Sequence, residues 1–437
     1  MNFSDIVLAS FSQLFGGIGE SFALFAKVWF FLLPPVLYPL WKMLWMDHIQ
    51  LKYALSLNHV LLEIVPPKEV EKSPKLMESV FSGLSGILKG FTAVEEFIVG
   101  QYPASFSIEM TSEDGIVHMY IRTQRNFRNL IEAHFYSQFP DVEIVEVPDY
   151  IYNVPMTIPN NEWDLWGSEF EFTKPDLYPI RTYPTFDEEV TGKMIDPLAG
   201  VIEALGKVAP GQRMWLQYII IPEGEKWYAK GRAIIDEFLE KEKAEKQSLW
   251  QLLLHDLKEV FFGIFRETIA STHVEPEFTV LGKAEKEEAQ PLEFRLSPGQ
   301  KDVLKALERN LGKQMFKTKM RLLYLGRREG FDRSNISNIM GAFKQFSDQN
   351  MNGFKFNDAS KTYANYLFVN ERLRYRQRRL FRRYIFRDPT PTDKMFMMST
   401  EELATVFHMP DMSVVAPTLA RVSTKRAGAP ANLPIES

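Results

Sequence analysis

The stretch SFSIEMTSEDGIVHMYIRT, residues 105–123, decides the fold that this sequence predicts. Apolar and polar residues alternate on both sides of Asp114 and Gly115. An Asp-Gly pair between two alternating runs is a strong signal for a β-hairpin. We therefore expect two antiparallel strands that are joined by a tight turn at this pair.

On either side of this hairpin the sequence predicts one helix and one further strand. Upstream, HVLLEIVPP at 59–67 is typical of a strand that prolines end, and residues 74–90 have apolar side chains at helical spacing. Downstream, residues 124–138 show the same helical spacing, and VEIVEV at 142–147 is typical of a last strand. This order of strands and helices is that of the ferredoxin-like split unit, with two helices on one face of a sheet.

A weak internal repeat predicts a second α/β sandwich. Asp196 and Ser297 each precede a proline, about three turns of helix, a short polar link and an apolar strand that ends at Pro222 or Leu325. The predicted class is α+β, with an N-terminal transmembrane helix, two ferredoxin-like α/β sandwich units, a helical insertion and an extended C-terminal linker. The predicted boundaries are a membrane anchor at 1–47, a first domain at 48–155, a second domain at 156–388 with the helical insertion at 226–272, and a connector tail at 389–437.

The N-terminal segment FALFAKVWFFLLPPVLYPLWKMLW, residues 22–45, contains only two charges, Lys27 and Lys42. Roughly 20 apolar residues suffice for a helix to cross a bilayer, so we expect one membrane-spanning helix. Residues 1–26 contain no basic residue, which argues against a cleaved signal peptide, and the lysines downstream place the rest of the chain in the cytoplasm. The predicted spanning residues are Phe22, Val28, Trp29, Phe30, Phe31, Leu32, Leu33, Val36, Leu37, Leu40 and Trp41.

Three prolines in this segment, Pro34, Pro35 and Pro39, leave other interpretations open. A proline in mid-span removes a backbone hydrogen bond and kinks a helix. A re-entrant or interfacial hairpin, or a helix that is part of a soluble fold, therefore remain as alternatives.

Composition and motifs argue against catalysis. The chain has a formal net charge of −5 and no cysteine, which excludes disulfides, thiolate nucleophiles and cysteine-ligated metal sites. The sequence has no P-loop, no Gly-x-Gly-x-x-Gly after a strand, no Gly-x-Ser-x-Gly and no His-Glu-x-x-His. We therefore expect no catalytic, cofactor or metal site.

The strongest concentration of charge is ERLRYRQRRLFRRYIFR, residues 371–387, which contains eight arginines. On a helix, Leu373, Leu380, Phe381 and Tyr384 would form an apolar seam and the arginines would cover the remainder. Arginine suits two-pronged contacts with phosphate, so nucleic acid and the anionic leaflet of a membrane are two candidate partners. The third interpretation is a solvated helix whose arginines pair with acidic groups of the same chain. The candidate phosphate contacts are Arg372, Arg376, Arg378, Arg379, Arg382 and Arg383.

Several runs carry a resemblance to a known family. STEELATVFHMP at 399–410 and APANLP at 429–434 resemble the segment before the motor domain of bacterial type IV secretion and conjugative DNA-transfer ATPases of the coupling-protein-like kind. LLEIVPP at 61–67, EAHFYSQFPDVEIVEV at 132–147 and WGSEFEFTKPDLYPIRTY at 166–183 resemble their membrane-anchored N-terminal region, a domain of unknown function. The resemblance covers most of residues 20–435.

The resemblance implies a tethered, non-catalytic component of a translocation machine. Its expected place is the bacterial inner membrane, its expected partners are a separate translocation ATPase and DNA, and an oligomer is a further implication because the family's motors form rings. The sequence stops at Ser437, about where the family's P-loop would begin, so no catalytic residue is carried over. A generic membrane-anchored protein–protein adaptor and an enzyme with an unrecognised site are the alternatives.

Overall fold

The computed structural model describes residues 34–67 except 36, 73–186, 195–240 except 225, 297–388 and 395–411. The chain divides into two compact units. The smaller unit comprises Met1–Asn58 and Lys89–Ala104, and the larger comprises His59–Leu88 and Ser105–Ser437.

In the smaller unit a helix over residues 37–56 packs on the segment that contains the π-helix η2, Glu95–Val99. The indole Nε1 of Trp45 donates a hydrogen bond to the carbonyl oxygen of Phe97 over 2.9 Å. Gly100 ends η2 with a φ of +80°, and a Cβ atom there would lie 2.5 Å from the backbone of the first helix. This close approach therefore requires glycine.

The predicted membrane-spanning helix is contradicted, and with it the single-pass topology in the inner membrane. Among the residues that the structure describes, none of the helices combines the length and the apolar character that crossing a bilayer needs. The helix over 37–56 contains Asp47, His48 and Lys52, which shorten its apolar part. Three of the predicted spanning residues, Leu37, Leu40 and Trp41, lie on this helix with exposed side chains. The others lie outside the described residues: Phe22, Val28, Trp29, Phe30, Phe31, Leu32, Leu33 and Val36.

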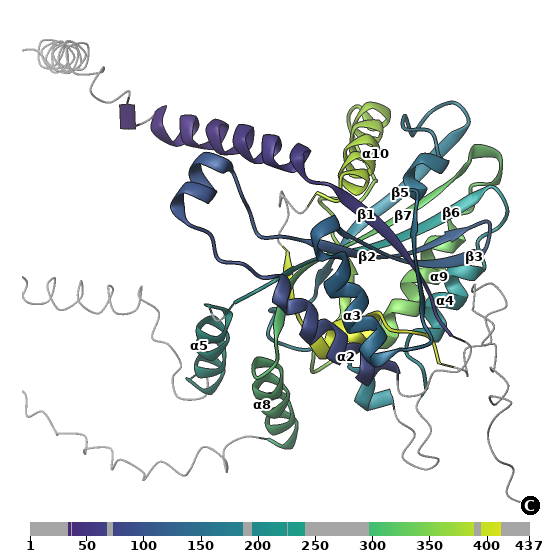
Figure 1. The fold of residues 1–437 in the computed structure, drawn as a ribbon. Coiled ribbons are helices and arrows are strands. Elements are labelled where there is room, and N and C mark those ends of the chain that lie inside the picture. The colour runs from purple at the N-terminus through teal and green to yellow at the C-terminus, as the bar shows by residue number, and fades with distance from the viewer. Residues whose placement is uncertain are drawn as a thin grey trace, which may run out of the picture. The chain divides into compact units, whose positions relative to one another are not determined.

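The larger unit is built on one sheet, which within the described residues has nine strands, all paired antiparallel (Figure 1). The strand order is β4-β1-β3-β2-β6-β7-β5-β8, and β9 pairs with β7 beside this path. The strands are β1 His59–Val65, β2 Phe106–Glu113, β3 Ile116–Gln124, β4 Glu143–Val147, β5 Trp163–Phe172, β6 Gln212–Pro222, β7 Met315–Arg327, β8 Phe354–Phe356 and β9 Phe396–Ser399.

The elements predicted around the hairpin are confirmed. β2 and β3 form the hairpin, and both turn residues, Asp114 and Gly115, have positive φ, as a tight two-residue turn requires. The two predicted helices are α2, Ser73–Leu84, and α3, Arg128–Gln138. These elements depend on short-range patterns of apolar and turn residues, so they can be predicted from the sequence.

The prediction of two separate ferredoxin-like units is wrong. β2 pairs with β6 from Phe106 opposite Ile220 to Glu113 opposite Arg213, so the sheet continues where the first unit was expected to end. A free edge strand exposes unpaired backbone groups, and β6 covers that edge. The two strands of the internal repeat, β6 and β7, lie side by side in the same sheet.

The C-terminal linker was also predicted as extended, and part of it is folded instead. β9 pairs with β7, and the short helix expected near residue 400 is α11, Thr400–Val406, with every residue buried. Within the predicted helical insertion the structure has α5, Lys226–Glu240, which packs on α8, Pro298–Leu311. The rest of the insertion, 241–272, lies outside the described residues.

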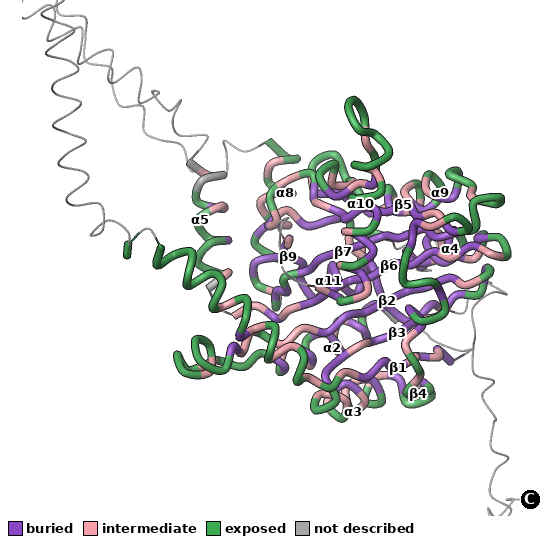
Figure 2. The backbone as a smooth tube through the Cα atoms, turned by 90° about the horizontal axis from the view of Figure 1, so that it is seen from above, coloured by how far each residue is buried: buried purple, intermediate pink, exposed green. Residues whose placement is uncertain are grey.

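Helices cover the two faces of the sheet unequally. α2, α3, α11, α4 (Ala199–Gly206) and α9 (Ser334–Phe343) lie on one face, and α10, Val369–Ile385, lies on the other (Figure 1). Successive residues of β6 point to opposite faces: Trp215 packs in the cluster with α10, whereas Tyr218 donates to α11. The strands between the helices are almost continuously buried, while the outer surfaces of the helices are exposed (Figure 2).

The predicted apolar seam of α10 is confirmed at three of its four residues, Leu373 being only half-buried, and a glycine in the sheet lets the helix approach it. Leu380, Phe381 and Tyr384 are buried against the strands. A Cβ atom on Gly167 in β5 would lie 2.7 Å from the side chain of Leu380 and 2.8 Å from a backbone oxygen of β7. The missing side chain therefore sets the distance between α10 and β5.

Replacing this glycine should loosen α10. We expect Gly167→Val to lower the free energy of unfolding by about 1–3 kcal/mol, because an overpacked core forces side chains and backbone to shift. The measurement is urea unfolding of the full chain. The control is Gly341→Ala in α9, where a Cβ atom meets nothing within 4 Å. Equal effects of the two variants would contradict this role of Gly167.

Candidate functional site

A row of polar side chains crosses the centre of the sheet beneath α10. Glu109 of β2, Gln217 of β6, Arg321 of β7 and Glu169 of β5 are successive partners in the strand pairing. All four are at most 1% exposed. Buried charges are tolerated only when they are paired and hydrogen-bonded. The segment that covers this row must therefore provide partners for its charged groups.

Arg321 joins the row to the C-terminal end of α10. Its Nε donates to Glu169 over 2.9 Å, Nη1 donates to the carbonyl of Arg383 over 3.1 Å, and Nη2 donates to the carbonyl of Asp388 over 2.7 Å. A cation at the last carbonyls of a helix satisfies unpaired acceptors and complements the helix dipole. Arg321 therefore fixes where α10 ends.

Arg387 pairs with Glu109 at the end of the row. Its guanidinium contacts both carboxylate oxygens of Glu109, at 2.9 and 3.0 Å, and both of Asp149, at 2.5 and 2.9 Å. Tyr150 donates to Glu109 over 2.6 Å. Burial alone would raise the pKa of Glu109, but the charge of Arg387 and these hydrogen bonds lower it to about 2. Glu109 is therefore a stable buried anion.

The backbone at Arg387 has a conformation that is usually reserved for glycine, so the contacts of the arginine side chain explain why this residue stands here. Its amide donates to Tyr384 and that of Asp388 donates to Arg383, which is the Schellman ending of a helix. The residue at this place usually is glycine, because φ is positive, and Arg387 has a φ of 47°. An arginine here accepts a strained backbone and gains four contacts with two carboxylates.

The outward side of α10 carries cations of a different kind. Arg374, Arg378, Arg379 and Arg382, here called the arginine face, make no hydrogen bond or ion pair with any part of the chain that the structure describes. Like charges at a spacing of four residues repel each other on a helix. The arginine face is therefore a concentrated positive charge without an ion-pair partner among the described residues.

Two hollows adjoin the arginine face and share Arg374 and Arg378. The first has a volume of about 870 Å³ and the second about 850 Å³. The first is lined by Glu371, Arg374, Tyr375, Arg378, Arg379, Arg382, Arg383, Phe386 and Asp388. The second is lined by Thr157, Pro159, Asn160, Asn161, Glu162, Arg328, Arg374 and Arg378. Arg374 and Arg378 thus lie between two open hollows.

The six predicted phosphate contacts do not share one role. Arg378, Arg379 and Arg382 lie on the arginine face. Arg372 and Arg376 donate instead to carbonyl oxygens of the preceding loop. The distances are 2.9 Å for Arg372 and 2.7 and 3.1 Å for Arg376. Arg383 is half-buried and makes a contact of its own. The prediction omitted Arg374. Assigning each residue to a side of the helix relative to the buried seam would have found it.

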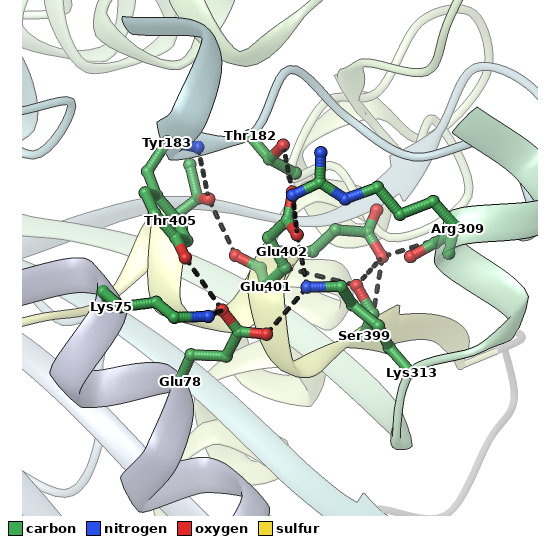
Figure 3. Close-up of polar contacts among 11 residues, drawn as sticks. Lys75, Glu78, Thr182, Tyr183, Arg309, Lys313, Ser399, Glu401, Glu402 and Thr405 are labelled. Carbon is green, nitrogen blue, oxygen red and sulfur yellow. Dashed lines mark hydrogen bonds and ion pairs between the residues drawn. The ribbon is translucent and has the colours of Figure 1, made fainter. Parts of the chain in front are cut away.

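A second polar cluster, on the opposite face of the sheet, joins α2, α8 and α11 (Figure 3). Lys313 contacts both Glu78 and Glu401, and Arg309 contacts Glu401 at 3.0 Å. Glu402, at the start of α11, is buried and accepts hydrogen bonds from Ser399 and from the backbone amide of Ile180. Its charged groups are paired with one another, so we interpret this cluster as structural.

Glu402 is a carboxylic acid of this cluster that is fully buried without a cation beside it among the described residues. Burial raises the pKa of Glu402 to about 7, although the hydrogen bonds from Ser399, Ile180 and Asn310 act in the opposite direction. Among the described residues there is no group of three or more acidic, histidine or cysteine side chains that could hold a metal ion.

Comparison with known proteins identifies the family of the chain. The model of a family described as "Domain of unknown function (DUF8128)" matches residues 47–421. The chain belongs to this family. A comparison with curated proteins finds no match. The family description assigns no activity, so function has to be argued from the site itself.

Breaking the central ion pair should be costly. We expect Arg387→Met to lower the free energy of unfolding by about 3–5 kcal/mol, because Glu109 is left as an unpaired buried charge. The double variant Glu109→Met/Arg387→Met should be more stable than Arg387→Met alone. Urea unfolding measures both, with Arg378→Met on the exposed face as the control. A double variant whose loss of stability equals the sum of the losses in Glu109→Met and Arg387→Met would contradict this account.

Glu402 should make stability depend on pH. The folded pKa of about 7 lies above the ordinary value of 4.5, so the folded state favours the protonated acid. The contribution is complete below pH 4.5 and is lost as the pH rises through 7, by about 3 kcal/mol in all. Relative to the wild type, we expect the free energy of unfolding of Glu402→Gln to rise by about that amount between pH 5 and pH 8. Urea unfolding at both pH values checks it, with Glu308→Gln on the exposed side of α8 as control. Parallel pH dependence in the wild type and Glu402→Gln would contradict the assignment.

Proposed function

We propose that this chain binds nucleic acid through the arginine face of α10. The observation that carries the proposal is the contrast between the two ends of the arginine segment. Arg387 is buried and paired with carboxylates. Arg374, Arg378 and Arg382 are exposed, Arg379 is half-buried, and none of the four has an ion-pair partner among the described residues. Unpaired like charges on one side of a helix are costly to fold, and an anionic partner offsets that cost.

The shape of the surface favours an elongated anion. Arg374, Arg378 and Arg382 are one helical turn apart, about 6 Å along the axis. Two hollows lie along this ridge and share its first two arginines. A single phosphate group would fill neither hollow, whereas a chain of phosphates passes through both and meets a guanidinium at successive groups.

The chemistry of the surface favours nucleic acid over an acidic protein. Arginine binds phosphate through two parallel hydrogen bonds, and a guanidinium also stacks on a base. Tyr375 and Phe386 line the first hollow among the arginines, with 64% and 70% of their surface exposed. Aromatic rings between arginines are typical of surfaces that follow a nucleic-acid backbone while bases stack on the rings.

The resemblance to DNA-transfer ATPases supports a role for this surface. We infer that the chain is a non-catalytic component of a translocation machine, which holds nucleic acid beside a separate motor protein. A binding role also agrees with the sequence, which has no P-loop. This part of the proposal rests on the resemblance, while the binding surface rests on α10.

Nucleic-acid binding should weaken with salt in a way that depends on the arginine face. We expect the full chain to bind a labelled DNA oligonucleotide, and Arg378→Gln/Arg382→Gln to bind it more weakly at low salt. The slope of log affinity against log salt should fall by roughly 1–2, because two fewer phosphates are neutralised. Fluorescence anisotropy over a salt series measures both quantities.

The matched control removes the same charge from another helix. Lys301→Gln/Lys305→Gln changes two exposed lysines of α8 and should leave the slope unchanged. If both double variants lower the slope equally, the binding is a general effect of net charge, and the assignment to α10 is wrong. No binding by the wild type at low salt would leave the protein-adaptor alternative.

A further inference from the structure

The loop that leads into α10 presents aromatic and aliphatic side chains to solvent. Tyr366, Leu367 and Phe368 are 88%, 77% and 74% exposed, which makes them among the most exposed large apolar side chains of the described residues. Large apolar side chains gathered at a protruding tip indicate an interaction site more often than isolated ones do. Residues 363–369 are here called the aromatic tip.

The aromatic tip is held in a strained conformation. Tyr366 and Phe368 have φ values of 69° and 55°, in the left-handed region that bulky residues rarely adopt. Strain of this kind persists where the surrounding structure fixes it, and it is concentrated at functional sites. The tip therefore has a defined shape although its rings are exposed.

The helix itself provides the groups that fix this shape. Arg372 donates to the carbonyl of Asn365 over 2.9 Å. Arg376 donates to the carbonyl of Tyr363 over 2.7 Å and to that of Lys361 over 3.1 Å. The arginines of α10 are thus divided: two hold the aromatic tip, and the arginine face is left for a ligand.

We propose that the aromatic tip stacks on unpaired bases and makes the chain select single-stranded over double-stranded nucleic acid. The inference rests on the proposed function and names the class of ligand. The charge of the arginine face identifies the partner as anionic, and the exposed rings next to it need a flat apolar surface. Among nucleic acids, an unpaired strand offers both at once, because the bases of a duplex are stacked on one another and turned away from the phosphates.

The geometry provides a continuous path for such a strand. Phe368 directly precedes the first residue of α10, and Tyr375 is exposed about 10 Å further along the axis. The arginine face begins beside Tyr375 and continues to Arg382. Exposed rings before the helix are thus followed along α10 by guanidinium groups.

The test compares two nucleic acids and three variants of the full chain. Binding to single-stranded oligothymidine and to a DNA duplex of equal length is measured by fluorescence anisotropy at one salt concentration. We expect Tyr366→Ala/Phe368→Ala to lose roughly tenfold or more in affinity for the single strand and less than about twofold for the duplex. Tyr366→Leu/Phe368→Leu keeps the apolar bulk without the aromatic face and should lose a similar factor. Tyr136→Ala/Tyr228→Ala removes two exposed rings elsewhere and should have no effect.

The outcomes separate this inference from the proposed function. Equal losses for single strand and duplex in the alanine variant, or full affinity in the leucine variant, would overturn base stacking by the tip. If Arg378→Gln/Arg382→Gln binds both nucleic acids as the wild type does, the proposed function itself fails. Near-ultraviolet circular dichroism of each variant confirms that the fold is retained, because all four substituted rings are exposed.

Discussion

The ion pair between Arg387 and Glu109 is the interaction on which the rest of the site depends. It joins Arg387, two residues beyond the end of α10, to β2, at the start of a polar row that continues through Gln217 and Arg321 to Glu169. Removing charges from water is unfavourable, so such a network stabilises little compared with apolar packing of the same volume. The network instead fixes the position of α10, because the helix can end only where Arg321 and Arg387 contact all their partners.

This fixed end determines what the helix presents to solvent. The buried seam of α10 faces the sheet, the glycine in β5 sets the distance, and the arginine face points outward as a consequence. Lys319, Arg321 and Arg387 inside the fold are paired with carboxylates, whereas the arginine face makes no ion pair with the described residues. The same short segment therefore contains both the structural anchor and the proposed ligand surface, and residues 372 and 376 link that surface to the aromatic tip.

The sequence predicts the local elements well and their assembly poorly. The hairpin at Asp114 and Gly115 and the seam of α10 follow from short-range patterns. Ser107 and Glu109 alternate with apolar residues, which is typical of a solvent-facing side of a strand, yet α10 buries them. Arg387, the partner of Glu109, lies 278 residues later, and no local pattern indicates such a pairing. The pairing of β2 with β6, which merges two expected sheets, is equally long-range. The prediction of a membrane span is wrong because the described helix of that segment continues through Asp47, His48 and Lys52, which interrupt its apolar character.

The most direct test of the account is photo-cross-linking of the full chain to a single strand that contains 4-thiothymidine, followed by mapping of the cross-linked peptides. The account predicts that cross-links fall on the aromatic tip and on the outward side of α10, between residues 363 and 386. It also predicts none on α8, which is similarly exposed. Cross-links spread evenly over the exposed helices, or concentrated away from α10, would contradict the claim that this helix is the nucleic-acid surface of the protein.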